Sequence, residues 1–92
     1  MSSTASTSLS LLVRLRKPED ADAWQRFVDL YSPLLFAWVR RVGLDSDEAA
    51  DLVQDVFVTL VQKMPAFEYD SRHSFRAWLK TIAYNRWRNL DQ

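Results

Sequence analysis

The chain has 92 residues, of which 48% are hydrophobic and 13% aromatic, enough for one small domain with a packed core rather than a disordered chain. Its 12 Lys and Arg residues balance 12 Asp and Glu residues, and a net charge of zero argues against indiscriminate binding to polyanions. There is no cysteine and His73 is the one histidine, so we expect no disulfide, metal site or cofactor. No apolar run approaches the roughly 20 residues that span a bilayer, so we expect a cytoplasmic protein without membrane insertion.

The N-terminal part of the chain predicts a tail followed by a short helix. Residues 1–8 are rich in Ser and Thr, which is typical of a disordered terminus. Leu9, Leu12 and Val13 then recur at helical spacing, which predicts a helix over about residues 9–16.

A longer helical pattern follows Pro18. Glu19 or Asp20 can begin the helix, and the apolar residues after it recur with a period of 3.6. Pro33 lies inside this pattern and lacks a backbone donor, so we expect a kink or a break there. The single glycine, Gly43, is expected to end the helix. The apolar positions are Trp24, Phe27, Val28, Leu30 and Tyr31, then Leu34, Leu35, Trp38, Val39 and Val42.

The clearest helical pattern begins at Asp45. Glu48 follows it three residues later, which resembles a capping box, in which each side chain accepts a hydrogen bond from the other residue's backbone N–H. Pro65 is expected to end this helix. The predicted core stripe consists of Leu52, Val53, Val56, Phe57, Leu60, Val61 and Met64.

The last helix is expected over about residues 75–91. A loop with turn-forming residues precedes it, and Ser74 can cap its first turn. Its predicted core residues are Phe75, Leu79, Ile82 and Ala83, with Trp78 at the border of the stripe.

Together these elements predict an all-α protein. No stretch shows the sustained alternation of a strand, and there is no internal repeat. We expect residues 9–92 to form a compact bundle of four to five helices.

One helical face is acidic. It lies opposite the core stripe of the helix that begins at Asp45, and its acids lack Lys or Arg at i+4, their usual partners on an exposed helix. The face is either an ordinary solvated surface or a docking surface for a basic partner, and the missing partners favour docking. Its residues are Asp51, Gln54, Asp55, Val58 and Gln62.

The last helix mixes bases, amides and rings, and residues 72–88 contain no acid. Arg and Asn bond phosphates and bases, and rings stack on unpaired bases. The alternative is a solvated face whose aromatic edges pack on neighbours. The mixture favours a surface for single-stranded nucleic acid. We place Arg76, Lys80, Tyr84 and Trp87 on one flank, and Thr81, Asn85 and Arg88 on the other.

The loop before this helix adjoins the same surface. Tyr69 offers a ring, Asp70 an acceptor, and Ser71 and Arg72 offer donors, a mixture that can line a pocket for an extruded base. The alternative is a plain connector. No Ser/His/Asp set, glycine-rich phosphate loop or pair of carboxylates is present, so we expect no enzymatic activity.

Two strings in this order resemble region 2 of bacterial sigma factors of the extracytoplasmic-function branch. They are "DEAADLVQDVFVTLVQKMPAF" and "SFRAWLKTIAYNRWRNL". The earlier "DADAWQRFVDLYSPLLFAWVRRVG" is similar to the first helices of that family, so the resemblance covers about residues 9–92.

The resemblance implies two partners. The acidic helix would dock on the clamp coiled coil of the largest subunit of core RNA polymerase, through Asp51, Gln54 and Asp55, with Val58 beside them. The last helix and its preceding loop would recognise the promoter −10 element and hold the non-template strand open, and an anti-sigma factor is a further expected partner. Matching positions are Arg76, Trp78, Lys80, Thr81, Tyr84, Asn85 and Arg88 in the helix, and Tyr69, Asp70, Ser71 and Arg72 in the loop.

Family members usually carry a second helical domain that reads the −35 element. This chain lacks it, so we expect one domain of a longer protein. The loop between Phe67 and Phe75 is longer than in familiar members, which leaves its single base contacts open. Two other interpretations remain: a helical DNA- or RNA-binding regulator outside the sigma family, and a protein-interaction bundle with no direct role on DNA.

Overall fold

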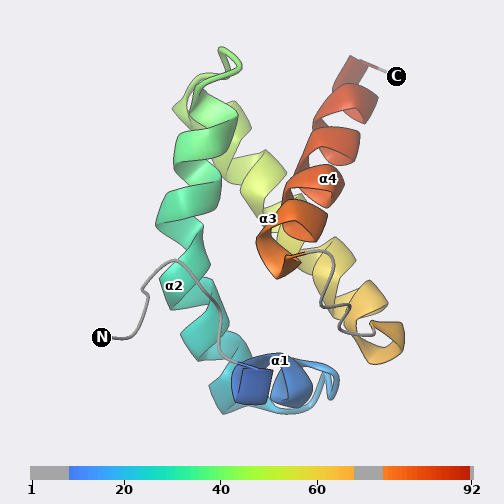
Figure 1. Cartoon of the computed structure of the whole chain (residues 1–92). Helices are drawn as coiled ribbons and strands as arrows, with labels where there is room; N and C mark the ends of the chain where they lie inside the picture. The colour runs from blue at the N-terminus through green and yellow to red at the C-terminus, as the bar shows by residue number, and fades with distance from the viewer. Residues whose placement is uncertain (1–8, 68–73, 92) are drawn as a thin grey trace.

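The computed structural model describes residues 9–67 and 74–91, and over these it contains α-helices and 3₁₀ turns but no strand (Figure 1). The elements, in chain order, are α1 (Leu9–Leu15), α2 (Ala21–Arg40), α3 (Ser46–Lys63), η1 (Met64–Ala66), α4 (Phe75–Arg88) and η2 (Asn89–Asp91). Helix α3 packs against both α2 and α4, and α1 packs on α2. The predicted all-α bundle of four to five helices is confirmed.

Helix α1 forms where predicted, but it buries a different face. Leu11, Leu12 and Leu15 are buried, whereas Leu9 is 58% and Val13 55% exposed. Both sets of positions satisfy helical spacing, so the sequence pattern alone did not decide between them. The contact with α2 selects the face, because it buries three leucines rather than a leucine pair and a valine.

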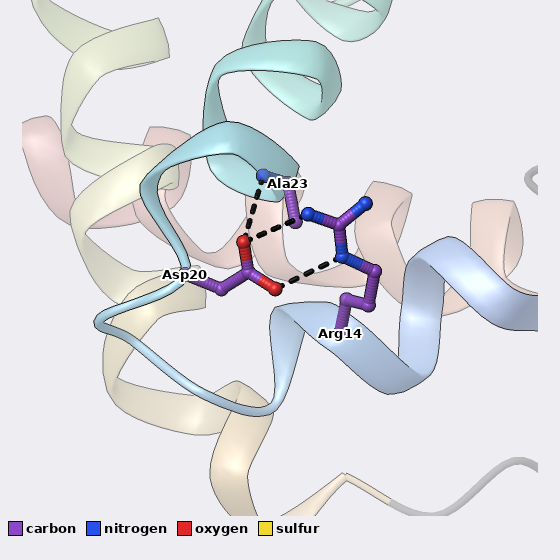
Figure 2. Close-up of polar contacts among 3 residues, drawn as sticks. All are labelled: Arg14, Asp20 and Ala23. Atoms are coloured by element: carbon purple, nitrogen blue, oxygen red, sulfur yellow. Dashed lines mark hydrogen bonds and ion pairs between the residues drawn. The ribbon is translucent and has the colours of Figure 1, made fainter.

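Asp20 joins the end of α1 to the start of α2 (Figure 2). Its carboxylate accepts a 3.2 Å hydrogen bond from Ala23 N–H and so caps α2. It also accepts bonds of 2.9 Å each from Nε and Nη2 of Arg14, a bidentate ion pair. The bonds from Arg14, followed by that from Ala23, lower the pKa of Asp20. Of the two predicted caps, Asp20 is therefore the one used.

Helix α2 buries one residue every four positions: Ala23, Phe27, Tyr31, Leu35 and Val39. Two residues of the predicted apolar pattern do not join the core: Leu30 is 60% exposed, and Val42, in the turn after α2, is 46% exposed. Of the kink or break predicted at Pro33, the break does not occur, because α2 continues through it. Proline at position 33 leaves the Asp29 carbonyl without its intrahelical donor, and both Pro33 and Asp29 are exposed residues on the solvent side of α2. The helix ends at Arg40, and Gly43 turns the chain with φ +98°.

Helix α3 begins with the predicted capping box. Glu48 N–H donates to Asp45 Oδ1 over 2.8 Å, and Asp45 N–H donates to Glu48 Oε1 over 3.1 Å. Most of the predicted stripe is buried, but Val61 is exposed and Thr59 is buried instead. The Thr59 hydroxyl donates to the Asp55 carbonyl over 2.9 Å, which satisfies it inside the bundle.

An aromatic cluster fixes the start of α4. Phe75 packs edge-on against Phe27 of α2 and Phe67 after η1, each with ring centroids 5.8 Å apart. Ser74 caps the helix, because its Oγ accepts from Ala77 N–H over 3.0 Å. The predicted core residues of α4 are all buried, and the side chains between them therefore have a fixed orientation.

Candidate partner and nucleic-acid interfaces

The α3 residues opposite the core stripe face outward. Asp51, Gln54 and Gln62 are exposed, and Val58 is 51% exposed. Asp51 also lines a pocket of about 280 Å³ with Glu48 and the apolar Leu44, Trp87 and Leu90. Two carboxylates beside an apolar wall suit a basic side chain, whose charged head and hydrocarbon stem need different surroundings.

Asp55 differs from the other residues of this face because it has a cationic partner. Arg86 of α4 donates to it through Nε over 2.8 Å and through Nη2 over 3.2 Å. The inference of an acidic face without basic partners was therefore wrong at Asp55. The i+4 test could not detect this partner, because Arg86 lies 31 residues away in the sequence. The Arg86 side chain is therefore directed toward α3 and does not belong to the outward side of α4.

The outward side of α4 carries the predicted mixture of groups. Lys80, Thr81, Asn85 and Arg88 are exposed, and Tyr84 is 54% exposed. Thr81 Oγ1 donates to the Ala77 carbonyl over 3.1 Å, as threonine often does within a helix. Arg76 is half-buried. The core stripe of α4 faces inward, so these groups share the surface available to a partner.

The predicted division of α4 into two flanks was wrong for Arg88. Its guanidinium carbon lies 5.7 Å from the Tyr84 ring centroid, one helical turn away on the same flank. Trp87 also contacts Tyr84, with ring centroids 5.6 Å apart. Lys80, Tyr84 and Arg88 follow each other at intervals of four residues and form a row of cation, ring and cation.

Trp78 occupies a different environment from the other predicted DNA contacts. Its ring centroid lies 4.6 Å from that of Phe67 and 5.7 Å from that of Phe75, and it is half-buried. The Trp78 ring therefore stabilises the start of α4, and part of the side chain remains accessible.

A groove between α2 and α4 was missed by sequence reasoning. It has a volume of about 160 Å³ and lies beside the row on α4. The Lys80 side chain reaches from α4 to α2, where its Nζ lies over the Trp38 ring, 5.3 Å from the ring centroid. Trp38 was assigned to the apolar pattern of α2, and its partial exposure could not be read from periodicity. The lining residues are Trp38, Val39, Val42, Lys80, Ala83, Tyr84 and Trp87.

The loop predicted to capture an extruded base lies outside the described residues. Its predicted contact residues are Tyr69, Asp70, Ser71 and Arg72.

Within residues 9–67 and 74–91, no cluster of three or more His, Cys, Asp and Glu side chains could hold a metal ion. No helix in that part of the chain is long and apolar enough to cross a bilayer.

The comparison with protein families identifies this helical arrangement. The model of sigma-70 region 2 matches residues 27–90, which contain most of α2 and all of α3 and α4. The chain belongs to the sigma-70 region 2 family. The match includes both the acidic face of α3 and the cation and ring row of α4, whereas α1 precedes it.

A curated relative refines the type of sigma domain. The chain is 36% identical over 75 residues to the ECF RNA polymerase sigma factor BldN of Streptomyces coelicolor. That alignment covers 80% of this chain and 28% of the relative, so the chain spans little more than a quarter of the relative's length. No solved structure gives a comparable match. This is a sigma region 2 domain of the extracytoplasmic-function type. Sigma factors as a family are DNA-binding transcription initiation proteins and are not enzymes.

Proposed function

We propose that this sigma region 2 domain binds core RNA polymerase through α3 and holds the melted −10 element through α4. The main support is that two outward surfaces of opposite charge come from adjacent helices: Asp51 and Gln54 on α3, and Lys80, Tyr84 and Arg88 on α4. A regulator that binds only DNA has no use for the acidic face, because it repels phosphate.

The α3 face accepts a basic surface of the polymerase, the clamp coiled coil of its largest subunit. Asp51 and Gln54 supply exposed acceptors, and Val58 adds an apolar contact. Asp55 takes part through its remaining accessible lone pairs, because its side chain is 37% exposed while bonded to Arg86. The pocket beside Asp51 receives a basic side chain of the partner.

The α4 face holds the non-template strand of the promoter. Unstacking DNA costs about 1.4 kcal/mol per base-pair step, and stacking one base on an aromatic side chain returns roughly 1–3 kcal/mol. Tyr84 offers such a ring, and Lys80 and Arg88 attract the phosphates on either side of it. Thr81, Asn85 and the accessible part of Trp78 add polar and stacking contacts. Binding energy, without nucleotide hydrolysis, therefore opens the strands.

The same proposal includes the setting of the domain. It acts in the cytoplasm, where polymerase and promoter DNA are found, and an anti-sigma factor controls access to it. A protein-interaction bundle without a role on DNA is the alternative, and the exposed cation and ring row of α4 argues against it.

Binding of core polymerase to charge-reversed variants tests this proposal. Asp51→Lys should weaken binding by about tenfold or more, because attraction becomes repulsion at the docking face. Asp29→Lys, a reversal on the exposed side of α2, and Lys80→Glu on α4 should bind as the unmodified chain does. Equal binding by Asp51→Lys and the unmodified chain, with both folded by circular dichroism, would refute the docking assignment.

A further inference from the structure

We propose that the groove between α2 and α4 is a binding pocket for one unpaired nucleobase, with Trp38 of α2 and Val42 of the turn after it forming the wall opposite Tyr84 and Trp87. This rests on the proposed function and extends it to α2, a helix with no assigned contact to nucleic acid. The groove holds about 160 Å³ and opens at the surface beside the row of Lys80, Tyr84 and Arg88.

The lining of the groove suits a planar aromatic ligand. Trp38 and Trp87 are half-buried and pack against the core, so the bundle holds their rings while part of each side chain remains accessible. Tyr84 is tilted by 42° to Trp87, so the two rings form an angled wall rather than a closed stack. Val42 is 46% exposed at the opposite edge. Base stacking on rings needs such rigid, partly exposed faces.

The charges around the groove favour an anionic ligand. Among the described residues that line it, Lys80 alone is charged. Its ammonium lies over Trp38, and the guanidinium of Arg88 lies over Tyr84. Contacts of this kind at exposed sites are weak, so an entering base displaces the cation from the ring and leaves it beside the phosphate. A base joined to its phosphate satisfies both the rings and the cations, whereas an apolar peptide segment leaves the cations without a partner.

Trp87 separates this groove from acidic side chains. The same residue lines the pocket that contains Glu48 and Asp51, which lies between α3 and the end of α4. One tryptophan therefore stands between the basic groove and the acidic pocket, and keeps the phosphate of a bound nucleotide away from the α3 carboxylates.

Photocrosslinking to a short single-stranded oligodeoxynucleotide tests this pocket. The probe carries 5-iododeoxyuridine in place of thymidine, because excitation joins this base to a ring stacked on it. Val42→Glu places a carboxylate at the edge of the groove, and Leu30→Glu makes the same change at a site on α2 that is 60% exposed. We expect crosslinks at Trp38, Tyr84 or Trp87, about tenfold fewer with Val42→Glu, and no change with Leu30→Glu.

The outcomes separate this pocket from the wider proposal. Crosslinks elsewhere on α4, unchanged in Val42→Glu, would refute the pocket and leave DNA binding by α4 intact. The absence of any crosslink or retained oligonucleotide would refute both. If Val42→Glu weakens binding of core polymerase but not of the oligonucleotide, the groove is a protein contact and the nucleobase assignment is wrong. Circular dichroism of both variants verifies that they fold.

Discussion

Arg86 of α4 and Asp55 of α3 form a bidentate ion pair, with Nε to Oδ2 at 2.8 Å and Nη2 to Oδ1 at 3.2 Å. This pair joins the helix with the acidic face to the helix with the basic face, at a point where both side chains remain partly exposed. Asp55 thus serves the packing of the bundle while it remains within reach of a partner.

A double-mutant cycle measures what this pair contributes to stability. The side chains are 40% and 37% exposed, so solvent screens their attraction and we expect a coupling of about 0.2–1 kcal/mol between Arg86→Gln and Asp55→Asn. Urea unfolding of the two single variants and the double variant gives the coupling. A value above about 3 kcal/mol would show that the pair behaves as a buried one.

The stability of the chain should depend on the ionisation of Asp20. Hydrogen bonds from Arg14 and Ala23 lower the pKa of Asp20 in the folded chain below its unfolded value of about 3.9. The stabilisation is therefore complete above the unfolded pKa and is lost as the pH falls through the folded pKa. Asp20→Asn keeps a capping oxygen but does not titrate.

Thermal unfolding at a series of pH values measures this effect. The midpoint of the unmodified chain should exceed that of Asp20→Asn at neutral pH, and the difference should shrink as the pH falls below the unfolded pKa of Asp20 and through its lowered folded pKa. A difference that stays constant over this range would mean that the ionised carboxylate adds nothing.

Replacement of Pro33 should stabilise the protein. Proline in a helix interior is about 3 kcal/mol less favourable than alanine, and proline's restriction of the unfolded chain offsets this by roughly 0.4–1 kcal/mol. Since α2 is continuous and Pro33 is exposed, we expect Pro33→Ala to raise the free energy of unfolding by about 2 kcal/mol. Chemical denaturation measures it, and a lower stability would show that the bundle depends on the proline.

Local signals in the sequence predicted most of the fold. Asp45 and Glu48, and Ser74, are caps whose bonds span three residues, so neighbouring letters carry the whole interaction. The predicted core residues of α4 were also correct, because apolar residues at helical spacing, such as Phe75 and Leu79, lie on one face of the helix.

Apart from the flank of Arg88, which a contact within α4 decides, the main errors depend on contacts between helices. The choice of face on α1 was decided by α2, and the tolerance of Pro33 was decided by which side of α2 faces solvent. The pairing of Asp55 with Arg86 and the groove beside Trp38 join residues far apart in the sequence. A single sequence gives the spacing within each helix but not the rotation of one helix against another, so these features required the structure.

Charge reversal on α4 is expected to leave polymerase binding intact while it abolishes strand capture. Lys80→Glu and Arg88→Glu together remove both cations of the α4 row, and these exposed residues are not part of the core. Capture by the unmodified chain should also weaken steeply as salt rises, because phosphate contacts release counterions.

The most direct test is selection from fork-junction DNA with a randomised single-stranded segment, using core polymerase together with the chain. The unmodified chain should enrich one short motif, the double Lys80→Glu and Arg88→Glu variant should enrich none while still binding polymerase, and Asp51→Lys should fail at polymerase binding. Enrichment of the same motif by the double variant, or of no motif by the unmodified chain bound to polymerase, would contradict the assignment of α4 to the melted strand.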